Sequence, residues 1–306
     1  MSSSPLLLNQ KTFCYYEPLQ PKIDSMNVLI IDNLLKNETD LSETAALEPD
    51  YNPLKWLTEE RHIAGLALEN ITRNILKLIK GGGRTKIVHL SELSESLIEK
   101  FNPDAIIISG TLRDFDLYNS AILSNFARIM KSTTVPVLGI CGGHQLVGVG
   151  FGADIVTLDN KDPRQKRTNR IREYEYRYVK VTKPDDPIFQ GLEDEQSRFW
   201  QAGTQSHVLR VWQNHGLMLD RVPEGFTNLA KSYLCPIQMM VKRGDGQLFY
   251  TVQYHLEKSF EDWNKLPSRW EHRNDSRDGR IIFENFLFEA LKHRGKVKEE
   301  RLPKIA

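Results

Sequence analysis

The sequence predicts an α/β fold in which a mostly parallel central sheet is flanked by helices on both faces, with antiparallel strands in the second half. Short apolar runs alternate with helix-like stretches from residue 27 to residue 140, as in parallel strands joined by crossover helices. After Gly152, strand-like runs follow one another with turns between them. Hydrophobic residues make up 40% of the 306 residues, which is enough to bury the core of one large domain.

The first half of the chain predicts strands and helices in strict alternation. The apolar run at residues 27–32 ends in aspartate, as expected of a buried parallel strand that leads into a loop. A helical stretch over residues 63–79 stops at the three glycines of residues 81–83. The remaining strands are expected at residues 86–90, 104–109 and 135–140, and the remaining helices at residues 92–101 and 120–130.

The second half predicts strands separated by turns and one final helix. The strands are expected at residues 174–181, 199–211, 226–232 and 248–254. Apolar residues recur at helical spacing over residues 279–292, which predicts the last helix.

The chain divides into an N-terminal arm at residues 1–25, one domain at residues 26–292 and a charged tail at residues 293–306. Three insertions are expected within the domain, at residues 34 to about 62, 159–171 and 258–278. The second contains the basic run from Arg164 to Arg170, for which a solvated loop is favoured over a binding patch. The third contains Trp263 and Trp270, and a lid or partner contact is as well supported there as an inert loop.

Charge and cysteine usage exclude several classes of function. Lysine and arginine number 41 against 40 acidic residues, so no general positive field draws in nucleic acid or an anionic membrane. No stretch approaches the ~20 apolar residues of a membrane span. Cys14, Cys141 and Cys235 are an odd, widely spaced set, which argues against a disulfide framework or a metal site and favours a reducing cytoplasm.

The segment from Val135 to Gly148 has the pattern of a nucleophile elbow. An apolar strand runs directly into Gly139-Ile-Cys141-Gly-Gly143 and then into a predicted helix. The chain folds sharply past itself in such a turn, so the positions two before and two after the nucleophile must be small. The helix N-terminus favours a thiolate at Cys141. From this motif alone, a buried core cysteine in a glycine-rich turn remains the alternative.

His255 and Glu257 lie at the end of the strand expected at residues 248–254. They are the candidate base and its partner. Side chains two residues apart on a strand share one face, so the carboxylate can orient the imidazole. A surface pair is the alternative for this motif taken by itself. The N–H of Gly142 is one candidate for an oxyanion hole, and Gly110 or Thr111 could supply a second donor, unless Gly110 only ends a strand.

Two motifs resemble those of class I glutamine amidotransferases. Gly139-Ile-Cys-Gly-Gly-His-Gln145 resembles the family's Gly-x-Cys-x-Gly-x-Gln, and Gln253-Tyr-His-Leu-Glu257 resembles its Gln-Phe-His-Pro-Glu. The resemblance extends from about residue 26 to 292. It departs from the family at Ser109-Gly-Thr-Leu-Arg113, where Gly-Gly-Pro or Gly-Pro-Gly is usual, and at Leu256, which replaces proline.

The resemblance implies the same fold and a Cys-His-Glu catalytic set, with Cys141 as nucleophile, His255 as base and Glu257 as its orienter. It also implies that Gln145 holds the amino-acid end of the substrate. Gln213-Asn-His-Gly-Leu217 is similar to a family segment that contacts glutamine, which implies substrate-binding roles for Asn214, Gly216 and Leu217.

The leading interpretation is hydrolysis of glutamine through a cysteinyl thioester, with the ammonia passed to a separate synthetase. The sequence has no Gly-x-x-x-x-Gly-Lys-Ser/Thr phosphate loop, so ATP-dependent chemistry is expected on the partner, and no cofactor is expected here. A free-standing γ-glutamyl hydrolase, with a wider pocket at residues 111–116, is the second interpretation. A non-catalytic binding subunit is the third.

Overall fold

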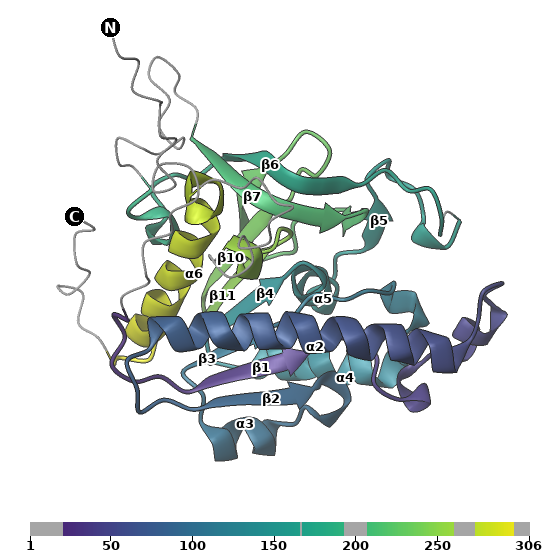
Figure 1. Cartoon of the computed structure of the whole chain (residues 1–306), viewed down its shortest axis with the longest axis horizontal. Helices are drawn as coiled ribbons and strands as arrows, with labels where there is room; N and C mark the ends of the chain where they lie inside the picture. The colour runs from purple at the N-terminus through teal and green to yellow at the C-terminus, as the bar shows by residue number, and fades with distance from the viewer. Residues whose placement is uncertain (1–20, 166, 193–206, 260–272, 297–306) are drawn as a thin grey trace, which may run out of the picture.

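The computed structural model describes residues 21–165, 167–192, 207–259 and 273–296. Its centre is a nine-stranded sheet (Figure 1) in the order β2-β1-β3-β4-β11-β10-β9-β6-β7. The first five strands are mutually parallel: β2 (Thr85–His89), β1 (Val28–Asp32), β3 (Ala105–Ile108), β4 (Val137–Ile140) and β11 (Gln247–Val252).

The other four strands of this sheet pair in antiparallel fashion: β10 (Met239–Gly244), β9 (Phe226–Lys231), β6 (Glu173–Val181) and β7 (Val208–His215). The short strands β5 (Ile155–Thr157) and β8 (Leu217–Leu219) form a separate antiparallel pair. The predicted fold class is confirmed, including the change from parallel to antiparallel pairing.

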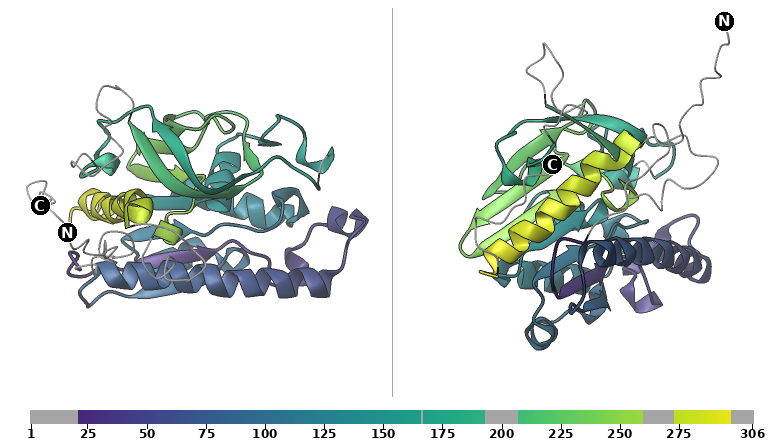
Figure 2. Two further views of the ribbon diagram at one scale, coloured as in Figure 1. Left: turned by 45° about the horizontal axis from the view of Figure 1, so that its top comes forward. Right: turned by 60° about the vertical axis from the view of Figure 1, so that its left-hand side comes forward.

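Helices cover both faces of the sheet. Alternate residues of β1 belong to different cores, because successive strand side chains point to opposite faces. Val28 and Ile30 pack with the apolar faces of α2 (Pro53–Leu78) and α6 (Arg273–His293). Leu29 and Ile31 belong to the second core, with α3 (Glu95–Phe101), α4 (Ser120–Ser132) and α5 (Gly142–Gly150). The long helix α2 and the yellow α6 can be followed from two further sides in Figure 2.

Helix α2 begins ten residues earlier than the sequence predicted. Asn52 caps it by accepting a hydrogen bond from the Lys55 N–H at 3.0 Å, and Pro53 takes the first helical position. Trp56 and Glu60 of this early part are buried. The helix start expected at residue 63 was therefore wrong, because a cap and buried contacts stabilise helix over a mostly polar stretch.

Other differences are smaller. Strand β7 begins at Val208 and extends to His215, while residues 199–206 of the predicted strand lie outside the described residues. Strand β10 was not predicted. The insertion predicted at residues 258–278, with both tryptophans, also falls mostly outside the described residues. Among the described helices, none combines the length and apolar character needed to cross a membrane.

The carboxyl ends of the parallel strands meet at one edge of the sheet, where open α/β folds place their ligands. Ile108, at the end of β3, pairs with Gly139 of β4, and Val252, at the end of β11, pairs with Ile140. The residues that follow these strands are therefore brought to one place.

Candidate active site

Cys141 occupies the turn between β4 and α5, with φ 52° and ψ −105°. This positive φ is unfavourable for a residue with a side chain. The Cys141 N–H donates to the Val252 carbonyl at 2.8 Å, and the side chain is almost fully buried. A Cβ on Gly139 would lie 2.7 Å from the Gly143 carbonyl oxygen, and one on Gly143 would lie 2.6 Å from that of Ile108. Both positions therefore require glycine.

His255 and Glu257 form a buried pair, with Nδ1 of the imidazole 2.6 Å from a carboxylate oxygen. The backbone N–H of His255 donates to the Trp212 carbonyl at 2.9 Å, which anchors this segment to β7. Burial lowers the pKa of His255, but its electrostatic interactions, with Glu257 first and Cys141 second, outweigh burial and raise it to about 9. Burial raises the pKa of Glu257, and the attraction of His255 more than reverses this, so that the pKa is lowered.

Gly110 lies between the cysteine and the histidine. A Cβ on Gly110 would be 3.7 Å from Cβ of Cys141 and 3.7 Å from Cε1 of His255. The Nε2 atom of His255 is buried and has no hydrogen-bond partner among the described residues. The structure thus brings these three predicted residues together and leaves the imidazole with a free nitrogen.

The two predicted oxyanion segments also lie side by side. Gly142 is the first residue of α5, so its N–H has no acceptor within the helix. A Cβ on Gly142 would lie 2.5 Å from the backbone nitrogen of Thr111. The hydroxyl groups of Thr111 and Tyr118 are 2.5 Å apart, and Tyr118 donates to the Asn33 carbonyl at 2.9 Å. Tyr118, which no sequence motif marks, holds this loop in place.

Gln145 is buried beneath the turn and bonded within the protein. Its side-chain nitrogen donates to the Leu217 carbonyl and to the side-chain oxygen of Gln253, both at 3.1 Å. The side-chain nitrogen of Gln253 is in turn 3.7 Å from Sγ of Cys141. Gln145 therefore joins α5 to the ends of two other strands, and both of its donor hydrogens are occupied.

A cavity of about 210 Å³ opens at Cys141. Six further residues singled out from the sequence line it: Thr111, Gly142, Gln145, Asn214, Gly216 and Leu217. His255, Glu257 and Gly110 are not among its lining residues. A larger hollow of about 510 Å³ shares Asp114 and Leu217 with this cavity but contains none of the candidate catalytic side chains.

The family model for glutamine amidotransferase class-I matches residues 67–271, which is more than half of the chain. The chain belongs to the class-I glutamine amidotransferase family. The amidotransferase relatives found by sequence include a protein named GMP synthase [glutamine-hydrolyzing] from Lactobacillus gasseri, 32% identical over 166 residues. That match covers 54% of this chain and 26% of the relative, so the chain matches about a quarter of the relative's length.

Solved structures of low sequence identity share the fold. A putative GMP synthase component from Thermoplasma acidophilum superposes with a TM-score of 0.55 at 21% identity, covering 88% of this chain and 96% of that one. A glutamine amidotransferase from Thermotoga maritima gives a TM-score of 0.51 at 15% identity, covering 87% and 98%.

The basic run lies against the pocket of this amidotransferase. Arg170 donates to both carboxylate oxygens of Asp114, at 2.8 and 2.5 Å. Arg167 binds Asp114 at 2.6 Å, Asp116 at 2.6 Å and Glu48 at 2.8 Å. The interpretation of this run as a solvated loop was wrong for both arginines, because both are paired with carboxylates. The sequence did not reveal the pairs, since the acidic partners lie more than 50 residues away.

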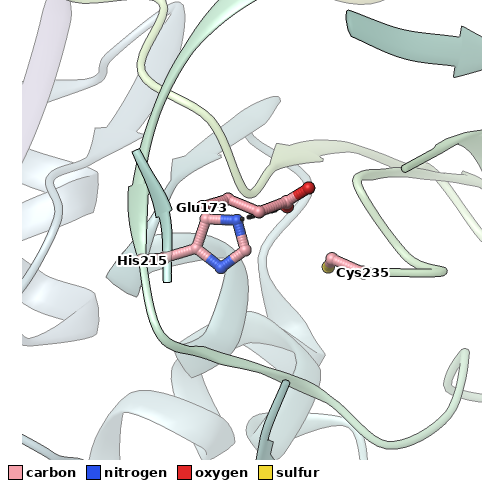
Figure 3. A group of neighbouring side chains, drawn as sticks. All are labelled: Glu173, His215 and Cys235. Carbon is pink, nitrogen blue, oxygen red and sulfur yellow. Dashed lines mark hydrogen bonds and ion pairs between the residues drawn. The ribbon is translucent and has the colours of Figure 1, made fainter. Parts of the chain in front are cut away.

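Glu173, His215 and Cys235 form a buried cluster that the sequence did not reveal (Figure 3). Their ligand-type atoms lie within 4.8 Å of one another, and these residue types can bind zinc. The imidazole, however, contacts Glu173 and the Leu217 carbonyl, each at 3.0 Å, and Gln238 donates to Glu173 at 2.7 Å. These hydrogen bonds account for the His215–Glu173 pair without an ion.

One member of this cluster, His215, also lines the cavity at Cys141. Burial raises the pKa of the Cys235 thiol, and the charge of Glu173 raises it further. His215 lines the cavity, and its bond to the Leu217 carbonyl positions the segment that also accepts from Gln145. His215 therefore has a positioning role at the rim of the cavity.

Proposed function

We propose that this chain hydrolyses the side-chain amide of glutamine to glutamate and ammonia through a thioester on Cys141. The observation that carries the proposal is the position of Cys141, which lies at the cavity with Gln145 and Asn214 in its lining and His255 across Gly110. This elbow-like turn presents the sulfur, and the family of the chain makes glutamine the first substrate to test.

In the first half of the proposed reaction, the sulfur attacks the amide carbon and a C–S bond forms. The pKa of His255, raised to about 9 by Glu257 and Cys141 against the effect of burial, supports an imidazolium beside a thiolate. The N–H of Gly142, with that of Gly110 or Thr111, donates a hydrogen bond to the carbonyl oxygen and stabilises its negative charge. The C–N bond breaks as Nε2 of His255 gives its proton to nitrogen, and ammonia leaves.

In the second half, His255 removes a proton from water, which attacks the thioester carbon. The C–S bond breaks, the sulfur returns as thiolate, and glutamate leaves. Glu257 holds Nδ1 and keeps Nε2 directed at the reacting atoms. The proposal thus assigns a catalytic role to each member of the predicted set.

The proposal includes a separate synthetase as acceptor of the ammonia. The relatives named GMP synthase [glutamine-hydrolyzing] are matched over only about a quarter of their length, whereas the putative GMP synthase component from Thermoplasma acidophilum is matched over 96%. A cytoplasmic location is also proposed, because free thiols such as Cys141 and Cys235 persist in a reducing compartment. The domain limits at residues 26 and 292 remain predictions.

The test is release of glutamate and ammonia by purified protein, alone and with its synthetase. We expect Cys141→Ala to abolish release and Cys235→Ala, which removes the second buried free thiol of the described residues, to retain it. Turnover of γ-glutamyl dipeptides far above glutamine would favour the free-standing hydrolase. A Cys141→Ala protein with full biological function would point instead to a non-catalytic binding role.

A further inference from the structure

Among the described residues, three arginines line the cavity at Cys141, and two of them already have carboxylate partners. Arg113 donates to Glu59 at 2.9 Å, and its guanidinium stacks over Trp56 at 4.0 Å from the ring centroid. Arg170 has the two-bond contact with Asp114 described above. The charges of these two arginines are therefore balanced within the protein.

Arg172 differs from both. It is exposed, lines the same cavity, and makes no hydrogen bond or ion pair with any described residue. Its neighbour Glu173 pairs in register with His215, which places Arg172 beside Gly216. A Cβ on Gly216 would lie 3.4 Å from Cγ of Arg172, so the glycine allows the two segments to form one wall.

Gln145 is poorly suited to bind a carboxylate. Both hydrogens of its side-chain nitrogen are directed at the Leu217 carbonyl and the Gln253 oxygen, which leaves its oxygen, an acceptor, for a ligand. An acceptor suits the ammonium group of an amino acid. The carboxylate needs a donor with positive charge, because a carboxylate removed from water without a partner is strongly disfavoured.

We propose that Arg172 binds the α-carboxylate of the substrate and so selects amides of amino acids over simple amides. This inference rests on the proposed glutamine hydrolysis and names the group that recognises its substrate. Arg113 and Arg170 shape the cavity. Arg172 also lines it, and its positive charge has no partner among the described residues.

The experiment compares L-glutamine with 4-aminobutanamide, which is glutamine without its carboxylate. We expect Arg172→Met to lower kcat/KM for glutamine about 10- to 100-fold, the range for loss of a hydrogen bond to a charged group. The value for 4-aminobutanamide should change less than about twofold. Arg172→Lys should recover part of the glutamine activity, because lysine keeps the charge but not the planar fork.

Arg177→Met is the matched control, since Arg177 is exposed on β6, which begins directly after Arg172, and does not line the cavity. It should leave both substrates unaffected. Equal losses on both substrates in Arg172→Met, or an unchanged glutamine rate, would overturn the carboxylate assignment while leaving the proposed hydrolysis standing.

A wild-type protein that cleaves neither amide would contradict the proposed function separately. Labelling of Cys141 then decides the role of Arg172 without turnover. The reagent 6-diazo-5-oxo-L-norleucine carries the amino-acid end of glutamine, whereas iodoacetamide does not. Arg172→Met should slow labelling by the first about 10-fold or more and leave the second unchanged. Equal labelling of wild type and variant by both reagents would overturn the assignment.

Discussion

One part of the lining of the Cys141 cavity comes from a single continuous turn, whereas the other part is assembled from three segments that are distant in the sequence. Cys141, Gly142 and Gln145 lie within five positions of one another at the start of α5. The rest of the lining comes from residues 111–114, 170–172 and 214–217. The first part is constrained by backbone geometry and the second by ion pairs, so substitutions in the two parts should have different effects.

The turn should be the least tolerant part. In Gly139→Ala, the new Cβ would meet the Gly143 carbonyl oxygen at 2.7 Å, so the backbone must shift and Cys141 with it. We expect glutaminase activity to fall about 1,000-fold or more, since misplacement of reacting groups by about 1 Å costs about 100-fold alone. Gly65→Ala is the control, because a Cβ there meets nothing within 4 Å in α2. It should raise the free energy of unfolding by roughly 0.5–1 kcal/mol. Full activity in Gly139→Ala would refute the geometric constraint.

Glu257→Gln should be the next most damaging change. It removes the charge that supports the imidazolium, so kcat/KM should fall about 100-fold or more. The pKa of His255, raised to about 9, should drop, and the alkaline limb of the pH–rate profile should move to lower pH. An unmoved limb would show that His255 does not control it.

The same pKa shift affects stability. Because the folded pKa of His255 lies above the unfolded value of about 6.5, its protonation stabilises the fold fully below that pH. This contribution is lost as the pH rises through about 9. Denaturant titrations of wild type and Glu257→Gln between pH 6 and 10 should show a weaker dependence in the variant.

Substitutions in the part of the lining that is assembled from residues 111–114, 170–172 and 214–217 should have more moderate effects. Asp114→Asn leaves Arg170 without its two-bond partner and weakens the hold on Arg167. We expect KM for glutamine to rise about 10-fold with little change in kcat, and unfolding free energy to fall by about 1–3 kcal/mol. Asp162→Asn, which removes only the pairing to Arg164 on the surface, should change neither. A lowered kcat with unchanged KM in Asp114→Asn would place this loop in the chemical step instead.

The smallest effect is expected at Glu60, which is buried beside Arg113 of the cavity lining. Burial raises the pKa of Glu60 to about 7, although Arg113 and Arg61 oppose the change. The folded protein therefore binds this proton more tightly than the unfolded chain, and stability falls as the pH rises from about 4.5 through 7. Glu60→Gln should flatten this dependence and raise unfolding free energy at pH 8 by about 1 kcal/mol. A variant as pH-dependent as wild type would show that Glu60 is not the titrating group.

The sequence by itself determined the fold class and the turn at Cys141, because both depend on local pattern. Strand and helix periodicity, glycines two residues either side of a cysteine, and a His-x-Glu strand end are all visible within a few residues. The start of α2 was missed because residues 53–62 are mostly polar and show no apolar periodicity. They become helical through a cap and buried contacts.

Only the tertiary structure decided the other part of the cavity lining. Arg170 and Asp114 are 56 residues apart, and His215 and Glu173 are 42 apart. Ion pairs and buried hydrogen bonds of this kind depend on which side chains the sheet brings within a few ångströms, and a charged residue looks the same in sequence whether it is solvated or paired. For this reason the residues expected to perform the chemistry could be named in advance, whereas Arg172 became a candidate only when its neighbours were seen to be paired.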